Sequence, residues 1–132
     1  MSPLLSVLVL AIVLGGFNSF AATFTWTNLN GGNASGSWAN GANWSGATLP
    51  TTTNDTASFT NLDVTADSTV TLDGNQVISA LTFGDAAGSS GANWLLHPGS
   101  PTNSTLTLGG ATPRIMVSGL GSGKSAIISA KE

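Results

Sequence analysis

Apolar residues follow two different patterns along this chain. Residues 4–14 form one uninterrupted apolar run, whereas from residue 23 onward apolar residues come in short clusters that alternate with Thr, Ser and Asn. Alternation with a period of two is typical of strands that bury one face. The clusters that predict strands are residues 23–27, 55–59, 62–66, 68–73, 77–83, 94–96, 104–108, 113–117 and 126–128. The pattern therefore predicts an all-β fold behind an apolar N-terminal segment.

The first apolar run predicts a secretory signal peptide. It has the length of a signal-peptide core and is short for a bilayer span. Ser19 and Ala21 supply small residues at the positions that a signal peptidase requires, so we expect a signal-peptide helix within residues 1–21 and cleavage after Ala21. An uncleaved anchor or a buried strand is the less favoured alternative. The first three residues carry no Lys or Arg, which departs from the usual signal-peptide pattern. Export would place the protein in the secreted fraction or at the outer cell surface.

The spacing of the predicted strands fits two architectures. From residue 68 onward the strands start about ten to sixteen residues apart, and Gly, Asn, Ser or Pro fill each gap. One solution is an antiparallel β-sandwich built from hairpins. The other is a solenoid, in which each strand stacks on its equivalent in the next coil. We favour the solenoid, because the connections exceed two-residue hairpin turns and ladders of Thr, Asn and Val suit stacked coils.

Within the strand clusters, the pattern also predicts which side chains point inward. The cluster at 77–83 is expected to be one strand with Val77, Leu81 and Phe83 on one side, and the cluster at 104–108 is expected to turn Leu106 and Leu108 inward.

The four tryptophans divide the exported part into two predicted regions. Trp26, Trp38 and Trp44 lie in a Trp-rich N-terminal capping region, residues 22–66, where 28–50 reads as a long loop; residues 67–132 form the solenoid strands and contain Trp94. The rings either plug one end of the solenoid or form an exposed sugar-stacking surface. We favour the plug, and a carbohydrate-binding β-sandwich is the alternative function.

Charge and cysteine content exclude several kinds of partner. The chain has three Lys or Arg, six Asp or Glu, one histidine and no cysteine. There is no basic stripe for nucleic acid, and we expect no membrane span after the leader is removed. Without cysteine, no disulfide framework stabilises the domain.

The residues that could carry chemistry do not form a convincing site. His97 is the only histidine, which argues against zinc, and Asp63 and Asp67 would share one face of a strand without a reason for a raised pKa. Asp73 and Asp85 are expected in turns. Residues 118–125 resemble a phosphate-binding loop, but Ser118 replaces its first Gly and a β-rich tail replaces the following helix. The sequence therefore predicts no enzyme, and no catalytic, cofactor-binding or metal site.

An ordered series of short motifs carries a family resemblance. The motifs are Trp26, SGSWANGANW (35–44), Leu49-Pro50, DTASF (55–59), VTLDG (70–74), ISALTFGD (78–85), Trp94-Leu95-Leu96, STLTLGG (104–110) and PRIMV (113–117). Together they cover nearly all of residues 24–130. The series resembles the N-terminal region of bacterial autotransporter-associated β-strand repeat proteins.

The resemblance implies a right-handed parallel β-helix in an exported, adhesin-like surface scaffold without a catalytic site. Relatives are expected to continue into many Gly- and Leu-rich repeats, so we expect a fragment, a truncated product or a small stand-alone relative. Further β-repeats of a longer chain or surface glycans are the expected partners. A solenoid of few coils also has an unprotected edge, which we place near Ile127 and Ile128.

Overall fold

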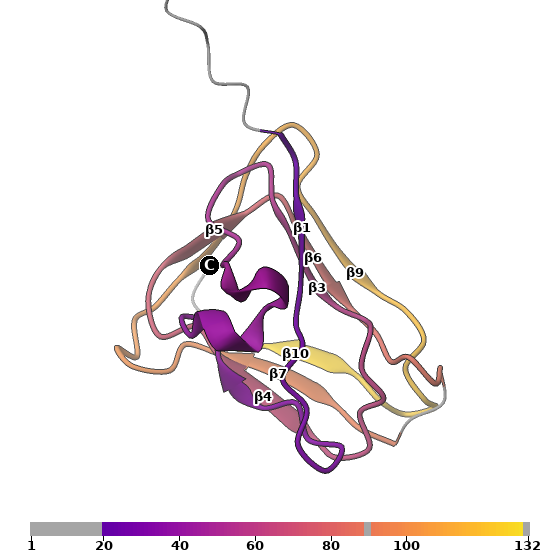
Figure 1. Ribbon diagram of the computed structural model, residues 1–132. Coiled ribbons are helices and arrows are strands. Elements are labelled where there is room, and N and C mark those ends of the chain that lie inside the picture. Colours follow the sequence, from indigo (N-terminus) through magenta and orange to yellow (C-terminus); the bar gives the residue numbers. More distant parts are fainter. Residues whose placement is uncertain (1–19, 89–90, 131–132) are drawn as a thin grey trace, which may run out of the picture.

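In the computed structural model, which describes residues 20–88 and 91–130, the chain forms three parallel sheets (Figure 1). The first sheet has the order β1 (Thr23–Thr25), β3 (Thr56–Phe59), β6 (Ala80–Phe83), β9 (Arg114–Val117). The second has the order β2 (Gly36–Ser37), β4 (Ser68–Thr71), β7 (Trp94–His97), β10 (Ala126–Ile128). The third pairs β5 (Gln76–Ile78) with β8 (Leu106–Leu108). Two short 3-10 helices, η1 (Gly41–Asn43) and η2 (Ser45–Ala47), follow β2.

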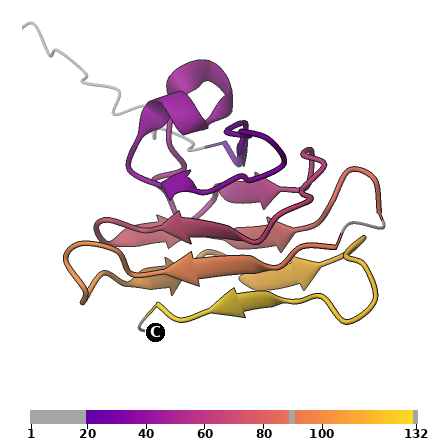
Figure 2. The same cartoon turned by 90° about the horizontal axis from the view of Figure 1, so that it is seen from below.

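The chain visits the sheets in rotation, and each circuit is called a coil here. The first coil contains β1 and β2, the second β3 to β5, the third β6 to β8, and the fourth β9 and β10. Figure 2 shows these coils as successive layers, from the 3-10 helices at one end to the C-terminal strands at the other. The fold is thus all-β and solenoid-like. Because every pairing between named strands is parallel, the antiparallel β-sandwich is wrong for the described residues.

Strand register produces continuous inward-facing columns. Ala57 pairs with Leu81 and Leu81 with Ile115; Phe59 pairs with Phe83 in the same way. Side chains alternate across a strand, so the residues of each column share one face. The columns of the first and second sheets meet in a single buried core.

The predicted strands are largely present, with two local corrections. Residues 62–66 form no strand, because the Asp85 carboxylate accepts the Val64 N–H (2.7 Å) in place of a neighbouring strand. The cluster at 77–83 is two strands: the chain turns at Ser79, whose N–H donates to Asp55 O (2.8 Å), and Ile78 rather than Val77 is buried with Leu81.

Other predictions are refined rather than overturned. The segment 28–50, expected as a loop, contains β2 and both 3-10 helices. Leu106 and Leu108 pack against the core as expected. β10 is an edge strand with Ile127 about half exposed, which confirms the predicted edge. The predicted signal helix at 1–21 lies almost entirely outside the described residues.

Candidate functional site

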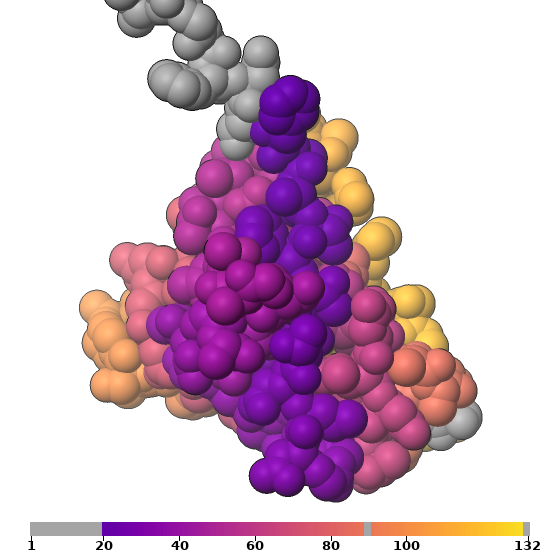
Figure 3. Space-filling view, in the orientation of Figure 1, coloured from indigo at the N-terminus to yellow at the C-terminus, as the bar shows by residue number. Residues whose placement is uncertain are grey.

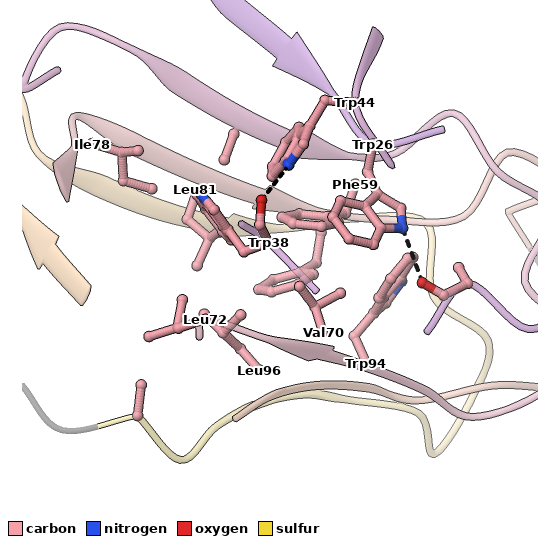
Figure 4. Close-up of a cluster of buried hydrophobic side chains, with 14 of the residues drawn as sticks. Trp26, Trp38, Trp44, Phe59, Val70, Leu72, Ile78, Leu81, Trp94 and Leu96 are labelled. Atoms are coloured by element: carbon pink, nitrogen blue, oxygen red, sulfur yellow. Dashed lines mark hydrogen bonds between the residues drawn. The ribbon is translucent and has the colours of Figure 1, made fainter. Parts of the chain in front are cut away.

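Aromatic rings fill one end of the coil stack, which we call the capped end. Phe59 lies at its centre: its ring centroid is 5.4 Å from that of Trp26, 5.8 Å from Trp38 and 5.5 Å from Trp44 (Figure 4). It also stacks on Phe83 of the next coil at 5.2 Å. These four rings and Phe59 are each no more than 2% exposed. The arrangement seals the first coil against the second.

The indole N–H groups tie this aromatic cluster to the backbone. Trp26 Nε1 donates to Ala34 O and Trp44 Nε1 to Trp38 O, both at 2.9 Å, and Trp94 Nε1 donates to Gly84 O at 3.0 Å. Among the buried side-chain nitrogen and oxygen atoms of the described residues, only Trp38 Nε1 has no hydrogen-bond partner. All four indoles are buried, so none of them presents an exposed ring face on which a sugar could stack.

The segment that carries η1 and η2 closes over this end. Thr27 N–H donates to Asn43 O (2.8 Å), and Trp26 bridges to Trp44, so the segment pairs with the chain that leaves β1. The approach at Gly36 is close enough that a Cβ there would lie 2.8 Å from Asn43 Nδ2 and 3.1 Å from a Trp26 ring carbon. Figure 3 shows N-terminal residues, in indigo to magenta, spread over this face.

Polar side chains link the coils at the corner before the second sheet, in what we call the corner ladder. Asn33 Nδ2 donates to Asp67 O (2.8 Å), the Asp67 carboxylate accepts the Asn93 N–H (2.7 Å), and Asn93 Oδ1 accepts the Ser125 N–H (3.0 Å). The last three of these residues directly precede β4, β7 and β10. The corner ladder therefore satisfies backbone groups where the strands begin.

Other aspartates act in the same way at other corners. Besides Val64, the Asp85 carboxylate accepts the N–H groups of Ala87 (2.8 Å) and Gly88 (3.1 Å). The Asp73 carboxylate accepts Ser100 N–H (2.8 Å) and the Thr71 hydroxyl (2.6 Å). These contacts hold the turns in place.

The carboxylates of Asp67 and Asp73 are more acidic than usual. Hydrogen bonds from the Asn93 backbone and side chain lower the pKa of Asp67, and nearby Lys124 adds to the effect. The pKa of Asp73 is lowered by hydrogen bonds from Ser37, Thr71 and the Ser100 N–H, in that order. A general acid needs a raised pKa, so neither group suits that role.

The structure does not assemble the catalytic candidates of the sequence. Asp63 and Asp67 were expected on one strand face, but Asp63 lies in the irregular 62–66 segment and is exposed. His97, at the exposed end of β7, accepts the Gly99 N–H at Nδ1 (3.1 Å). The loop 118–125 joins β9 to β10, so a strand follows it in place of the helix of a phosphate-binding loop.

The opposite end of the stack, formed by β9 and β10 and called the open end here, is the strongest candidate for function. Ile115 and Val117 occupy the inward columns of Leu81 and Phe83. Yet Ile115 is 46% and Val117 50% exposed, whereas Leu81 and Phe83 are at most 1% exposed. Both β9 and β10 are terminal in their sheets, so each has one backbone edge that pairs with no other described strand. The exposed apolar columns and the unpaired strand edges together form a surface of the kind that pairs and packs with further β-strands.

Within residues 20–88 and 91–130, no three His, Cys, Asp or Glu side chains gather as metal ligands. The same residues include no helix with the length and apolarity to cross a membrane. Comparison with protein-family models, curated proteins and solved structures finds no match.

Proposed function

We propose that this chain is an exported, non-enzymatic structural segment of a right-handed parallel β-helix with an adhesin-like role at the cell surface. Residues 22–66 cap one end of the stack, and residues 67–132 supply coils. A signal peptide at 1–21 directs the chain out of the cell. The family resemblance carried by the motifs between Trp26 and Val117 supports this proposal.

The observation that carries the proposal is the contrast between the two ends. At the capped end, inward-facing rings are buried; at the open end, inward-facing Ile115 and Val117 are about half exposed. In a solenoid each coil covers the apolar face of its neighbour, so an inward-facing exposed column marks a place where a coil would stack. The surface is therefore suited to receive further β-repeats.

A chain extended by further coils tests this role. Ile128 pairs with Leu96, so Ser129 corresponds to His97, and a second copy of residues 98–130 appended after Ser129 would continue in register. We expect a higher melting temperature and slower hydrogen exchange of the β9 and β10 amides, because the new coil covers them. The control is an extension of shuffled sequence and equal length. Equal melting and exchange in both extended proteins would refute the structural role.

Export is tested separately by N-terminal sequencing. When the chain is expressed in a bacterium with a Sec pathway, we expect an extracytoplasmic product that begins at Ala22. A cytoplasmic product that still begins at Met1 would contradict the export part of the proposal and would leave the stacking result unaffected.

A further inference from the structure

The open end has an apolar interior, and its outer face carries Arg114 together with the exposed Met116 and Ile127. Ile115 and Val117 face the axis of the stack together with Ile128, the column partner of buried Leu96. Arg114 alternates with Ile115 and lies on the outer face of β9. All five aspartates lie between residues 55 and 85, so none falls in the fourth coil. A partner must therefore supply apolar side chains at the centre and strand edges around them.

We propose that the open end binds the open end of a second copy of this chain, giving a two-fold symmetric dimer. The inference rests on the proposed role of the open end as a stacking surface. A two-fold axis across the stack brings the same apolar columns together from both copies and sets the facing strand edges antiparallel, a pairing that completes their hydrogen bonds. Arg114 stays on the outer face, in water.

The capped end limits the association to two copies. β1 and β2 are also terminal in their sheets, so what head-to-tail stacking would need on the N-terminal side is an exposed, inward-facing apolar column. There, the segment around η1 and η2 covers the first coil, and Trp26, Trp38 and Trp44 are buried (Figure 3). Only the open end can therefore take part in the contact. Each copy uses the same surface, so the contact is isologous and the assembly closes at two copies, unlike the heterologous contacts that generate fibres.

The size of the end is adequate for a specific contact. Ala80 pairs with Arg114, 34 residues later. At ~3.3 Å per residue that circuit has a perimeter of at most ~110 Å and encloses on the order of 500 Å². Two facing ends bury on the order of 1,000 Å² in total, which is near the lower limit for specific complexes. We therefore expect a dimer that dissociates on dilution.

Sedimentation equilibrium of the full 132-residue chain and two matched variants tests this inference. Ile115→Lys places a charge in the apolar centre of the contact, whereas Ile127→Lys places the same charge on the outer face of the same coil, where Ile127 is 51% exposed. We expect a monomer–dimer equilibrium in the parent chain. Ile115→Lys should raise the dissociation constant by ~100-fold or more, because two desolvated charges would meet, and Ile127→Lys should change it by less than ~3-fold.

Hydrogen exchange at low and high protein concentration provides a second readout. The amides of β9 and β10 should exchange more slowly at high concentration, and those of β1 at the capped end should not change. Circular dichroism establishes that each variant is folded. A folded parent chain that stays monomeric, species larger than a dimer, or equal weakening by both lysine variants would each overturn the dimer. If the parent chain is monomeric but the extended protein still gains a stacked coil, the dimer is rejected and the proposed structural role stands.

Discussion

The capped and open ends contain equivalent positions of one repeating structure, yet the side chains at these positions differ in burial. Phe59, Phe83 and Val117 lie in a single column, and their exposed fractions are 0%, 1% and 50%. The strand, the direction of the side chain and its apolar character are shared. What differs is the neighbouring layer. Phe59 packs against the aromatic cluster of the capped end, whereas Val117 lies in the last described coil and has no further coil stacked on it. Burial in this fold therefore depends on a neighbouring coil more than on residue type.

The largest expected effect contrasts the two ends of that column. Phe59→Ala should lower the free energy of unfolding by about 3–5 kcal/mol, because it removes a buried ring in contact with five other rings. Val117→Ala should cost less than about 1 kcal/mol when measured on the monomer. Urea unfolding at low protein concentration measures both values. Similar losses at the two positions would show that the contribution of an inward-facing residue does not depend on a neighbouring coil.

A smaller effect is expected at the polar corners. Asp85→Ala leaves the N–H groups of Val64, Ala87 and Gly88 without their carboxylate, and Asp85 is only 8% exposed, so we expect a loss of about 2–3 kcal/mol. The exposed Asp63 serves as the control, and its replacement by Ala should change stability by no more than about 0.5 kcal/mol. Thermal melts of the two variants measure both losses. A larger loss for Asp63→Ala than for Asp85→Ala would show that the corner contacts contribute little to stability.

At the capped end, Trp26 and Trp38 differ in the hydrogen bonding of their indole N–H groups. Trp26→Phe and Trp38→Phe remove similar volumes from the same cluster, but only the first deprives a backbone carbonyl, that of Ala34, of its donor. We expect Trp26→Phe to be more destabilising by about 1–2 kcal/mol. Chemical denaturation of the pair measures the difference, and a greater loss for Trp38→Phe would mean that its Nε1 has a partner in solution.

The smallest expected effect is a dependence on acid. Asp67 and Asp73 have lowered pKa values in the folded protein, so the unfolded chain binds protons more readily. Their contribution is complete above the unfolded value of about 3.9 and is lost as pH falls through the lower folded values. Asp67→Asn should therefore flatten the decline in melting temperature below about pH 4. An unchanged decline in this variant would exclude the corner ladder as a source of acid sensitivity.

The strands could be predicted because their signal is local, and the corners could not. Alternation around Val70 and Leu72 was enough to place β4, and the edge at Ile127 followed from a short stack. The strand predicted at 62–66 failed because the decisive partner of Val64 is Asp85, 21 residues away. The corner ladder joins residues 26 to 34 positions apart, a separation that depends on loop lengths. Nor does local hydrophobicity distinguish Ile115 from Leu81, since their exposure is decided by what stacks on them.

The corner ladder has a consequence for how such a chain can change in length. Its successive residues are separated by 34, 26 and 32 positions, although the strands that follow them lie in one sheet. Insertions between ladder residues therefore enlarge a surface loop and leave the strands on either side in register. Removal of residues 67–92 would join Ala66 directly to Asn93, with equivalent polar contacts on both sides of the junction. A gene for this fold can thus gain or lose whole coils in single steps.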